Sequence, residues 1–436
     1  MLTYKRTTIA WGLSATVALT AVLAGCSKDG GGTAASGSPA ATAGTASSAS
    51  AAPAKTEKPV EVTWYLAGEP QKDQAAIEAA VNKITEPAIG VTLKMNVFDF
   101  GTYDQKMSLK IASNEPFDLM FTSFSWLNKY LTNVSKGAFL PLDDLLAKNA
   151  PKFYASLPKK YWDATRVNGK IYGAPNYQIM VNWKGFMVQK SLADKYHFDY
   201  QHVTSIKQLE DFMDQVNKNE NGITPLGLSK VFGHAFLMDF GKNPSDYTDT
   251  LNGAVVRLGD PAHKLMTFQD DNEYRKRFTD LVNLMHGWYQ KGYIRKDAAS
   301  VADATADIKA GKYAMWPSTI KPGGNAELSA AYGFEVVMAP TTEPVATTQS
   351  ALATLTAVSR TSAHPDKAVQ LLELVNTNKE LYNLLSFGIK DKDYKQAADG
   401  TIEKLPDAGY WSNISWEFGN QFNGLYMKGQ KPGLWE

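Results

Sequence analysis

Strand-like and helix-like segments alternate along the first part of the chain, and this alternation constrains the fold more than any other feature. Apolar side chains recur at every second position in the strand-like segments and at helical spacing in the helix-like ones. The expected elements are strands over 60–68, 91–97 and 117–121 and helices over 73–87 and 103–112. Further along the chain, strands are expected over 312–316, ended by Pro317, and over 334–338. This pattern predicts an α/β fold with parallel strands, whose carboxyl ends share the edge where ligands bind. The loops after Leu66 and Phe121 are expected to share that edge.

The segment 162–183 predicts a passage from one globular unit into another. It contains an Asn-Gly turn and a short alternating strand that stops at Pro175, which has no N–H for ladder pairing. Asn176, Tyr177 and Trp183 follow it, and a core strand would leave such polar groups without partners. We therefore expect this segment to line a cleft.

Length and charge bound the class of protein. A chain of 436 residues with 44% hydrophobic content can form two or three globular units. Lys+Arg 45 against Asp+Glu 44 leaves no basic surplus that would indicate nucleic acid as a partner. We expect a monomer.

The first residues have the pattern of a secretion signal. Basic residues precede the apolar run 9–23, which is short for a membrane span, and small residues then lead to Cys26, the one cysteine of the chain. This resembles the lipobox of bacterial lipoproteins, which implies a signal peptide over 1–25 and lipidation of Cys26. The Gly/Ala/Ser/Thr-rich segment 26–59 is expected to be a disordered tether. The protein would then be extracytoplasmic and lipid-anchored to the cell membrane.

Several later segments share an order with one known family. They are WDATRVNGKIYGAP at 162–175, the strand and threonine-capped helix over 186–212, IKAGKYAMW at 308–316, and the strand and helix over 355–374. Together they resemble the extracellular solute-binding proteins of carbohydrate ABC importers. DLMFTSFSW, KGAFLPLDDLL and YWSNISWEFGNQF are similar to the LplA-type lipoprotein subgroup. Members of that subgroup usually continue into a small C-terminal domain beyond the point where this sequence stops.

The resemblance implies a two-lobe periplasmic-binding-protein-like (type II) fold with hinge strands between the lobes. Lobe 1 is expected to comprise 60–174 and about 321–376, and lobe 2 to comprise 175–320 and about 377–436. It also implies a protein that captures an oligosaccharide by lobe closure and delivers it to ABC importer permease subunits. The same resemblance implies no catalysis, no cofactor and no metal.

The candidate ligand-binding residues are aromatic and polar side chains at predicted strand ends and crossings, since sugars present hydroxyl groups and C–H faces. They are Glu69, Phe124, Ser125, Trp126, Asn176, Tyr177, Trp183, Trp316, Trp411, Asn413 and Trp416. Core or hinge packing is the competing interpretation for Trp126, Tyr177, Trp316 and Trp416.

Three alternatives stay open at this stage. A lipid-anchored glycan-degrading enzyme needs only two suitably spaced carboxylates, although no catalytic motif is present and the six histidines show no ligand spacing. A ligand sensor that feeds a signalling receptor would use the same lobe closure. The ligand could also be a uronate held by Lys184, Arg257 or Lys321.

Overall fold

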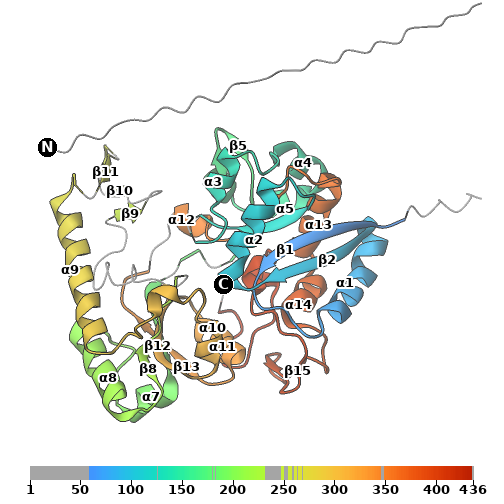
Figure 1. Ribbon diagram of the computed structural model, residues 1–436. Coiled ribbons are helices and arrows are strands. Elements are labelled where there is room, and N and C mark those ends of the chain that lie inside the picture. Colours follow the sequence, from blue (N-terminus) through green and yellow to red (C-terminus); the bar gives the residue numbers. More distant parts are fainter. Residues whose placement is uncertain are drawn as a thin grey trace, which may run out of the picture. The chain divides into compact units, whose positions relative to one another are not determined.

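The computed structural model describes residues 58–434 with the exception of 125, 179, 182, 231–246, 250–253, 258–259, 263, 268 and 345–347. Within this part lie a five-stranded and a four-stranded sheet, each with its own hydrophobic core on either face. We call each sheet with its helices a lobe (Figure 1).

The first sheet has the order β2-β1-β3-β14-β6. Its strands are β1 (Val60–Ala67), β2 (Val91–Phe98), β3 (Leu119–Thr122), β6 (Ala174–Pro175) and β14 (Leu355–Val358). β1 pairs in parallel with β2 and β3, whereas β14 runs antiparallel to both β3 and β6. The predicted run of parallel strands is confirmed.

Both faces of β1 are buried, which explains its nearly continuous apolar sequence. Val62, Trp64 and Leu66 lie in one core, and Tyr65 and Ala67 lie in the other. Because successive side chains of a strand point to opposite faces, one strand supplies both cores.

Helices cover this sheet, and α1 lies beside β1 and β2 in Figure 1. They are α1 (Gln74–Ile89), α2 (Phe100–Ala112), α3 (Tyr130–Ser135), α4 (Asp143–Asn149), α5 (Pro151–Ser156), α6 (Lys159–Ala164), α12 (Thr348–Ala351), α13 (Pro365–Thr377) and α14 (Lys379–Phe387). Pro87 does not close α1 as expected, because the helix ends at Gly90, whose φ of 65° is a left-handed cap.

The second sheet has the order β13-β7-β12-β8. Its strands are β7 (Trp183–Gln189), β8 (Thr224–Leu226), β12 (Tyr313–Ile320) and β13 (Val336–Pro340). Its helices are α7 (Lys190–Lys195), α8 (Ile206–Asn219), α9 (Asn272–Gln290), η3 (Ala298–Ser300), α10 (Thr305–Lys309) and α11 (Gly324–Tyr332). Phe186 and Val188 face one core and Met187 the other.

Pro317 lies inside β12, although the sequence predicts that it ends this strand. β8 pairs with β12 only at Tyr313 and Met315, whereas β7 pairs with it from Met315 to Ile320. Pro317 therefore occupies a stretch with a single neighbouring strand, where a missing N–H disrupts no second ladder.

Smaller elements complete the described chain. A three-stranded sheet is formed by β9 (Tyr247–Asp249), β10 (Ala254–Arg257) and β11 (Leu265–Thr267). Two hairpins pair β4 (Arg166–Val167) with β5 (Lys170–Ile171) and β15 (Tyr394–Gln396) with β16 (Ile402–Lys404). The single turns η4 (Ser415–Glu417) and η5 (Gln421–Asn423) follow.

The division of the chain between the lobes differs from the sequence-based one in two places. The segment 321–376 is predicted in lobe 1, but β13 within it pairs with β7 in the second sheet. The segment 377–436 is predicted in lobe 2, but α14, Tyr410 and Phe418 pack in the core around β1. Periodicity identifies a strand or helix and carries no information on which sheet it joins.

Candidate ligand-binding site

Four strands of the first sheet meet at one edge. The parallel strands β1, β2 and β3 end there at Ala67, Phe98 and Thr122. β14 begins there, because it is antiparallel to β3 and places Leu355 opposite Thr122. The residues that follow the first three strands and precede the fourth are thus brought together, at the edge where open α/β sheets bind ligands.

Four aromatic side chains gather at this edge, and we call them the aromatic cluster: Phe100, Phe121, Trp126 and Trp416. The rings of Phe121 and Trp416 are 5.5 Å apart, those of Trp126 and Trp416 are 5.8 Å apart, and Phe100 stacks on Trp416 at 6.4 Å. Phe121 is buried, whereas the other three are half-buried and keep part of their surface exposed. The cluster therefore combines one buried ring, Phe121, with three rings that keep accessible aromatic surface.

The loop after β3 fixes Trp126. The Ser123 hydroxyl accepts hydrogen bonds from the backbone N–H of Leu127 at 2.9 Å and of Trp126 at 3.3 Å. The indole Nε1 of Trp126 donates to the carbonyl oxygen of Ala353 at 3.3 Å. Hydrogen bonds thereby hold both the backbone and the indole ring of Trp126 at the strand edge.

Trp416 is held by the two residues that flank it in η4. The Glu417 Oε2 accepts a hydrogen bond from the Ala67 N–H at 3.1 Å, and Tyr382 donates from its hydroxyl to the Ser415 carbonyl at 2.9 Å. Glu417 is 0% exposed, and burial raises the pKa of its carboxyl well above the usual range. Its Oε1 has no hydrogen-bond partner among the described residues.

Phe100 is a member of the cluster that the sequence interpretation missed. It is the first residue of α2, which Asp99 caps by accepting a hydrogen bond from the Thr102 N–H at 3.0 Å. The available signal was its position, directly after a predicted strand on the ligand edge.

Amide and hydroxyl groups adjoin the cluster, and we call Asn176, Gln178 and Thr354 the polar set. Thr354 follows Ala353, the partner of Trp126, and accepts a 2.8 Å hydrogen bond from Gln178 Nε2 at its hydroxyl. Asn176 donates from its backbone to the Thr354 carbonyl at 3.1 Å. Asn176 is 3% exposed and its Nδ2 has no partner among the described residues. Such a donor needs a water molecule or a ligand.

Glu69 follows β1 at the same edge but contacts the second lobe. Its carboxylate pairs with Lys309 of α10, and both side chains are about one-third exposed. Burial, with the neighbouring charge of Lys309, lowers the pKa of Lys404. Glu69 therefore contributes a bridge between the lobes in this structure.

Tyr177 and Trp183 lie apart from the aromatic cluster. The ring of Tyr177 packs against Phe422 at 4.9 Å and Tyr161 at 5.7 Å. Trp183 begins β7 and packs, half-buried, against the second-lobe core. Phe124 packs beside the cluster and donates from its backbone to the Leu352 carbonyl at 2.9 Å.

Two predicted residues are core side chains. Trp316 and Trp411 are each 2% exposed and pack in separate hydrophobic cores, beside Tyr332 and Phe387 respectively. Their burial leaves almost no ring surface for a ligand in this structure, which favours core packing over the predicted ligand contact.

The remaining predicted positions differ in what the structure says of them. Asn413 has a φ of 57°, and its buried Oδ1 lacks a partner among the described residues. Ser125 lies outside the described residues, as does Cys26. Lys321 already pairs with Glu327 at 2.8 Å, and Arg257 pairs with two acidic side chains, so neither offers an unused charge to a uronate.

The described residues contain no group of three or more His, Cys, Asp or Glu side chains arranged to hold a metal ion. No helix in that same part of the chain combines the length and apolar character that crossing a bilayer requires.

Comparison with known proteins identifies the relatives of this chain. It is 28% identical over 378 residues to a carbohydrate ABC transporter substrate-binding protein of Streptococcus pneumoniae serotype 4, which covers 84% of this chain and 72% of the relative. The structure is similar to the N-glycan transport solute-binding protein NgtS of the same species in complex with Man1GlcNAc. That match has a TM-score of 0.73 and 25% identity over 86% of this chain and 81% of the other.

A more distant structure has the same fold. The substrate-binding protein Lmo0181 of Listeria monocytogenes matches 74% of this chain and 77% of its own at 17% identity, with a TM-score of 0.53. The fold is accordingly the two-lobe type II arrangement of solute-binding proteins. The family model for bacterial extracellular solute-binding proteins matches residues 67–381, and the chain belongs to that family.

Proposed function

We propose that this protein is the carbohydrate-binding component of an ABC importer, held outside the cell membrane by a lipid on Cys26. The observation that carries the proposal is the half-exposed aromatic cluster beside an unpartnered buried amide, Asn176 Nδ2. Aromatic faces stack on the C–H surfaces of sugar rings, and amide groups bond their hydroxyls. The site is binding, not catalytic.

The relatives support the choice of ligand class. One solved relative holds Man1GlcNAc and another structure of the same protein holds Man5GlcNAc. A neutral oligosaccharide also suits the site, because the carboxylate of Glu69 at this edge is paired with Lys309. The ligand proposed for this chain is therefore a neutral oligosaccharide.

Capture is proposed to occur by closure of the lobes. The aromatic cluster belongs to the first lobe, and its neighbour Gly101 lies against Ala302 and Asp303 of the second lobe. A sugar on the cluster would be enclosed by that segment, and exclusion of water strengthens each polar contact. Ligand binding must favour the closed form through this differential affinity.

The test measures binding by calorimetry, using the full chain with Cys26→Ser and the probes Man1GlcNAc and Man5GlcNAc. We expect saturable binding without conversion of the glycan in mass spectra. Trp126→Ala and Trp416→Ala should each raise the Kd at least about tenfold, as buried-edge tryptophans do at binding hot spots. Tyr289→Ala on α9, an aromatic residue that is 43% exposed, is the matched control.

Each part of the proposal has an outcome that contradicts it. Glycan cleavage would establish an enzyme, and unchanged affinity in both tryptophan variants would exclude the aromatic cluster. The anchor is tested by cell fractionation. Cys26→Ser should shift the protein from the membrane fraction to the soluble extracytoplasmic fraction, and retention of the variant on the membrane would exclude lipidation of Cys26.

A further inference from the structure

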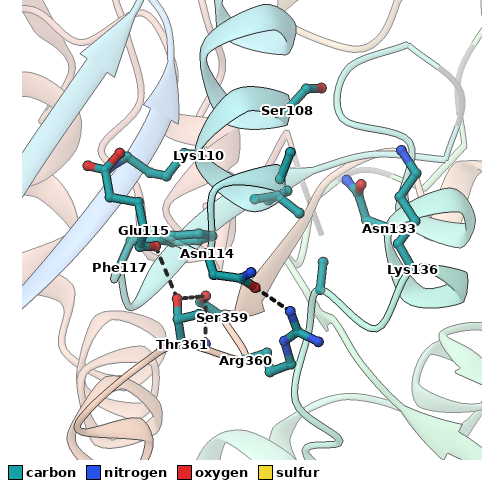
Figure 2. A pocket seen from close by; sticks show the side chains of 13 residues that line it. Ser108, Lys110, Asn114, Glu115, Phe117, Asn133, Lys136, Ser359, Arg360 and Thr361 are labelled. Atoms are coloured by element: carbon teal, nitrogen blue, oxygen red, sulfur yellow. Dashed lines mark hydrogen bonds and ion pairs between the residues drawn. The ribbon is translucent and has the colours of Figure 1, made fainter. Parts of the chain in front are cut away.

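A pocket lies at the opposite edge of the first sheet from the aromatic cluster. It has a volume of about 290 Å³. β3 begins just after its lining residue Phe117, and β14 ends just before its lining residue Ser359. The last turns of α2 and α3 supply the remaining walls (Figure 2). This pocket is not part of the proposed sugar site.

The pocket has an apolar base and a polar rim. Ile111, Phe117 and Ala138 line it with apolar surface, and the latter two are buried. Figure 2 shows Asn114 and Asn133 on opposite sides of the opening, with Arg360 below them. A pocket of this size accepts a small molecule, not an oligosaccharide chain.

Three cations line the pocket, and one of them is already neutralised. Lys110 pairs with Glu115 and lies 5.0 Å from the centre of the Tyr65 ring. Lys136 and Arg360 are exposed, and neither has a carboxylate within ion-pair distance among the described residues. Two positive charges therefore remain uncompensated on one rim.

Hydrogen bonds fix the position of Arg360, but no described carboxylate pairs with its guanidinium group. Its backbone N–H donates to the Ala138 carbonyl at 2.9 Å, and its guanidinium bonds the neutral amide oxygen of Asn114. The other guanidinium nitrogen lies over Gly137, the neighbour of Lys136 in the chain. The two cations therefore border the same space.

Helix capping does not account for these charges. The last carbonyl groups of α2 and α3 at this pocket are already satisfied by the backbone. The Lys110 carbonyl accepts the Glu115 N–H at 3.1 Å, and the Asn133 carbonyl accepts the Ala138 N–H at 3.0 Å. A cation at a helix end stabilises exposed carbonyls, and these are occupied.

We propose that this pocket binds the phosphate group of a small molecule. Two uncompensated cations match the charge of a phosphate monoester, and an arginine fork beside a lysine is a recurring arrangement for that group. The apolar base would receive the carbon skeleton. The phosphate can belong to a soluble ester or to a phospholipid headgroup. Binding measurements with soluble phosphates and with lipid vesicles distinguish these two sources.

The soluble arm uses calorimetry at low ionic strength with glycerol 3-phosphate and inorganic phosphate, on the full chain with Cys26→Ser. We expect saturable binding that weakens as salt is added. Arg360→Gln and Lys136→Gln should each raise the Kd at least tenfold. Lys83→Gln removes the same charge from an exposed position on α1 and should leave the Kd unchanged.

The lipid arm measures co-sedimentation with vesicles of phosphatidylglycerol against vesicles of phosphatidylcholine, using the same three variants. Binding to phosphatidylglycerol alone, lost in Arg360→Gln and kept in Lys83→Gln, assigns the pocket to a headgroup. The proposal is overturned when neither probe binds the parent protein, or when Lys83→Gln weakens binding as much as Arg360→Gln does. Glycan affinity should be equal in all variants, which separates this pocket from the sugar site.

Discussion

Glu417 shows how a single residue can make the position of the aromatic cluster sensitive to pH. It follows Trp416 in the chain, it is fully buried, and its one hydrogen bond fixes η4 to the end of β1. A buried carboxylate without a counter-ion is costly, so the residue stays protonated until the pH is well above the usual pKa of a glutamate. The support of Trp416 is therefore sensitive to the ionisation of its neighbour.

The pH dependence of stability follows from this raised pKa. The contribution of Glu417 to the free energy of unfolding is complete below its unfolded pKa of about 4.3 and is lost as the pH rises through the folded pKa. Glu417→Gln keeps the acceptor for the Ala67 N–H and does not ionise. We expect the variant to be the more stable protein at pH 8 and to equal the parent at pH 4 in urea unfolding.

The control for this prediction is Glu78→Gln. Glu78 is also buried, but it pairs with Lys94 at 2.9 Å and accepts the Met95 N–H at 2.9 Å, so its charge is compensated. Its removal should destabilise the protein at pH 8. Parallel pH profiles of the parent and the Glu417→Gln variant would contradict the prediction, because they would show that folding does not raise the pKa of Glu417.

Among the elements, α14 has the clearest structural task. It packs in the core around β1, and its Tyr382 holds η4, which carries Trp416. The helix begins at Asn378, whose side chain accepts a hydrogen bond from the Leu381 N–H at 3.0 Å. A nine-residue helix is too short to be stable alone, so its cap and its core contacts decide whether it forms.

Loss of this cap should be measurable. Asn378→Ala leaves the first N–H groups of α14 without their side-chain acceptor and should lower the free energy of unfolding by about 1 kcal/mol. Asn378→Gly should lower the free energy of unfolding by only a few tenths of a kcal/mol, since glycine tolerates the cap position. Urea unfolding measures both, with Lys379→Ala on the exposed surface as the control. Equal losses for alanine and glycine would contradict a capping role.

Periodic elements could be predicted from the sequence, and their partners could not. β1 is apolar over most of its length because it supplies two cores, and β2 alternates because Val91, Leu93 and Met95 face one core. Both strands lie where the sequence predicts them. β13 was also predicted as a strand, but nothing in its own residues states that it pairs with β7. Pro317 was read as a strand end because the sequence does not show that β12 has one neighbour there.

The candidate site shows the same limit. The sequence predicts Trp126 as a loop aromatic and Trp416 as part of the segment YWSNISWEF, and the structure places their rings 5.8 Å apart. Trp316 at a strand end and Trp411 in the same YWSNISWEF segment are also predicted, but both are core residues. Whether such a tryptophan is exposed or buried depends on the elements that pack over it in the folded protein. Its local sequence does not contain that information.

On the scale of the whole molecule, polar contacts join the first lobe and the C-terminal segment to the second lobe within the described residues. Glu69 pairs with Lys309, Gln421 donates to Glu327 at 3.0 Å, and Gln430 donates to the Gly323 carbonyl at 3.1 Å. Polar contacts of this kind orient the two lobes, but they contribute less stabilising free energy than a large apolar interface does. Each of these three polar contacts is therefore expected to cost little to break.

The ion pair of Glu69 and Lys309 should stabilise the contact between the lobes only weakly. Because both side chains are partly exposed, breaking the pair costs at most about 1 kcal/mol. Glu69→Gln and Lys309→Met should each weaken glycan binding at most about fivefold, and the double variant should lose no more than either single one. Calorimetry with Man5GlcNAc measures this cycle. Additive losses would show that the two residues act independently.

The first lobe is built from both ends of the chain, since β1 and Phe418 share one core, whereas the second sheet is formed by residues 183–340. During synthesis and export, the second sheet is complete while the segments that finish the first lobe have yet to emerge. The lobe that presents the aromatic cluster must accordingly wait for the last stretch of polypeptide. Because Trp416 lies in that last stretch, the aromatic cluster stays incomplete until the final residues of the lobe are available.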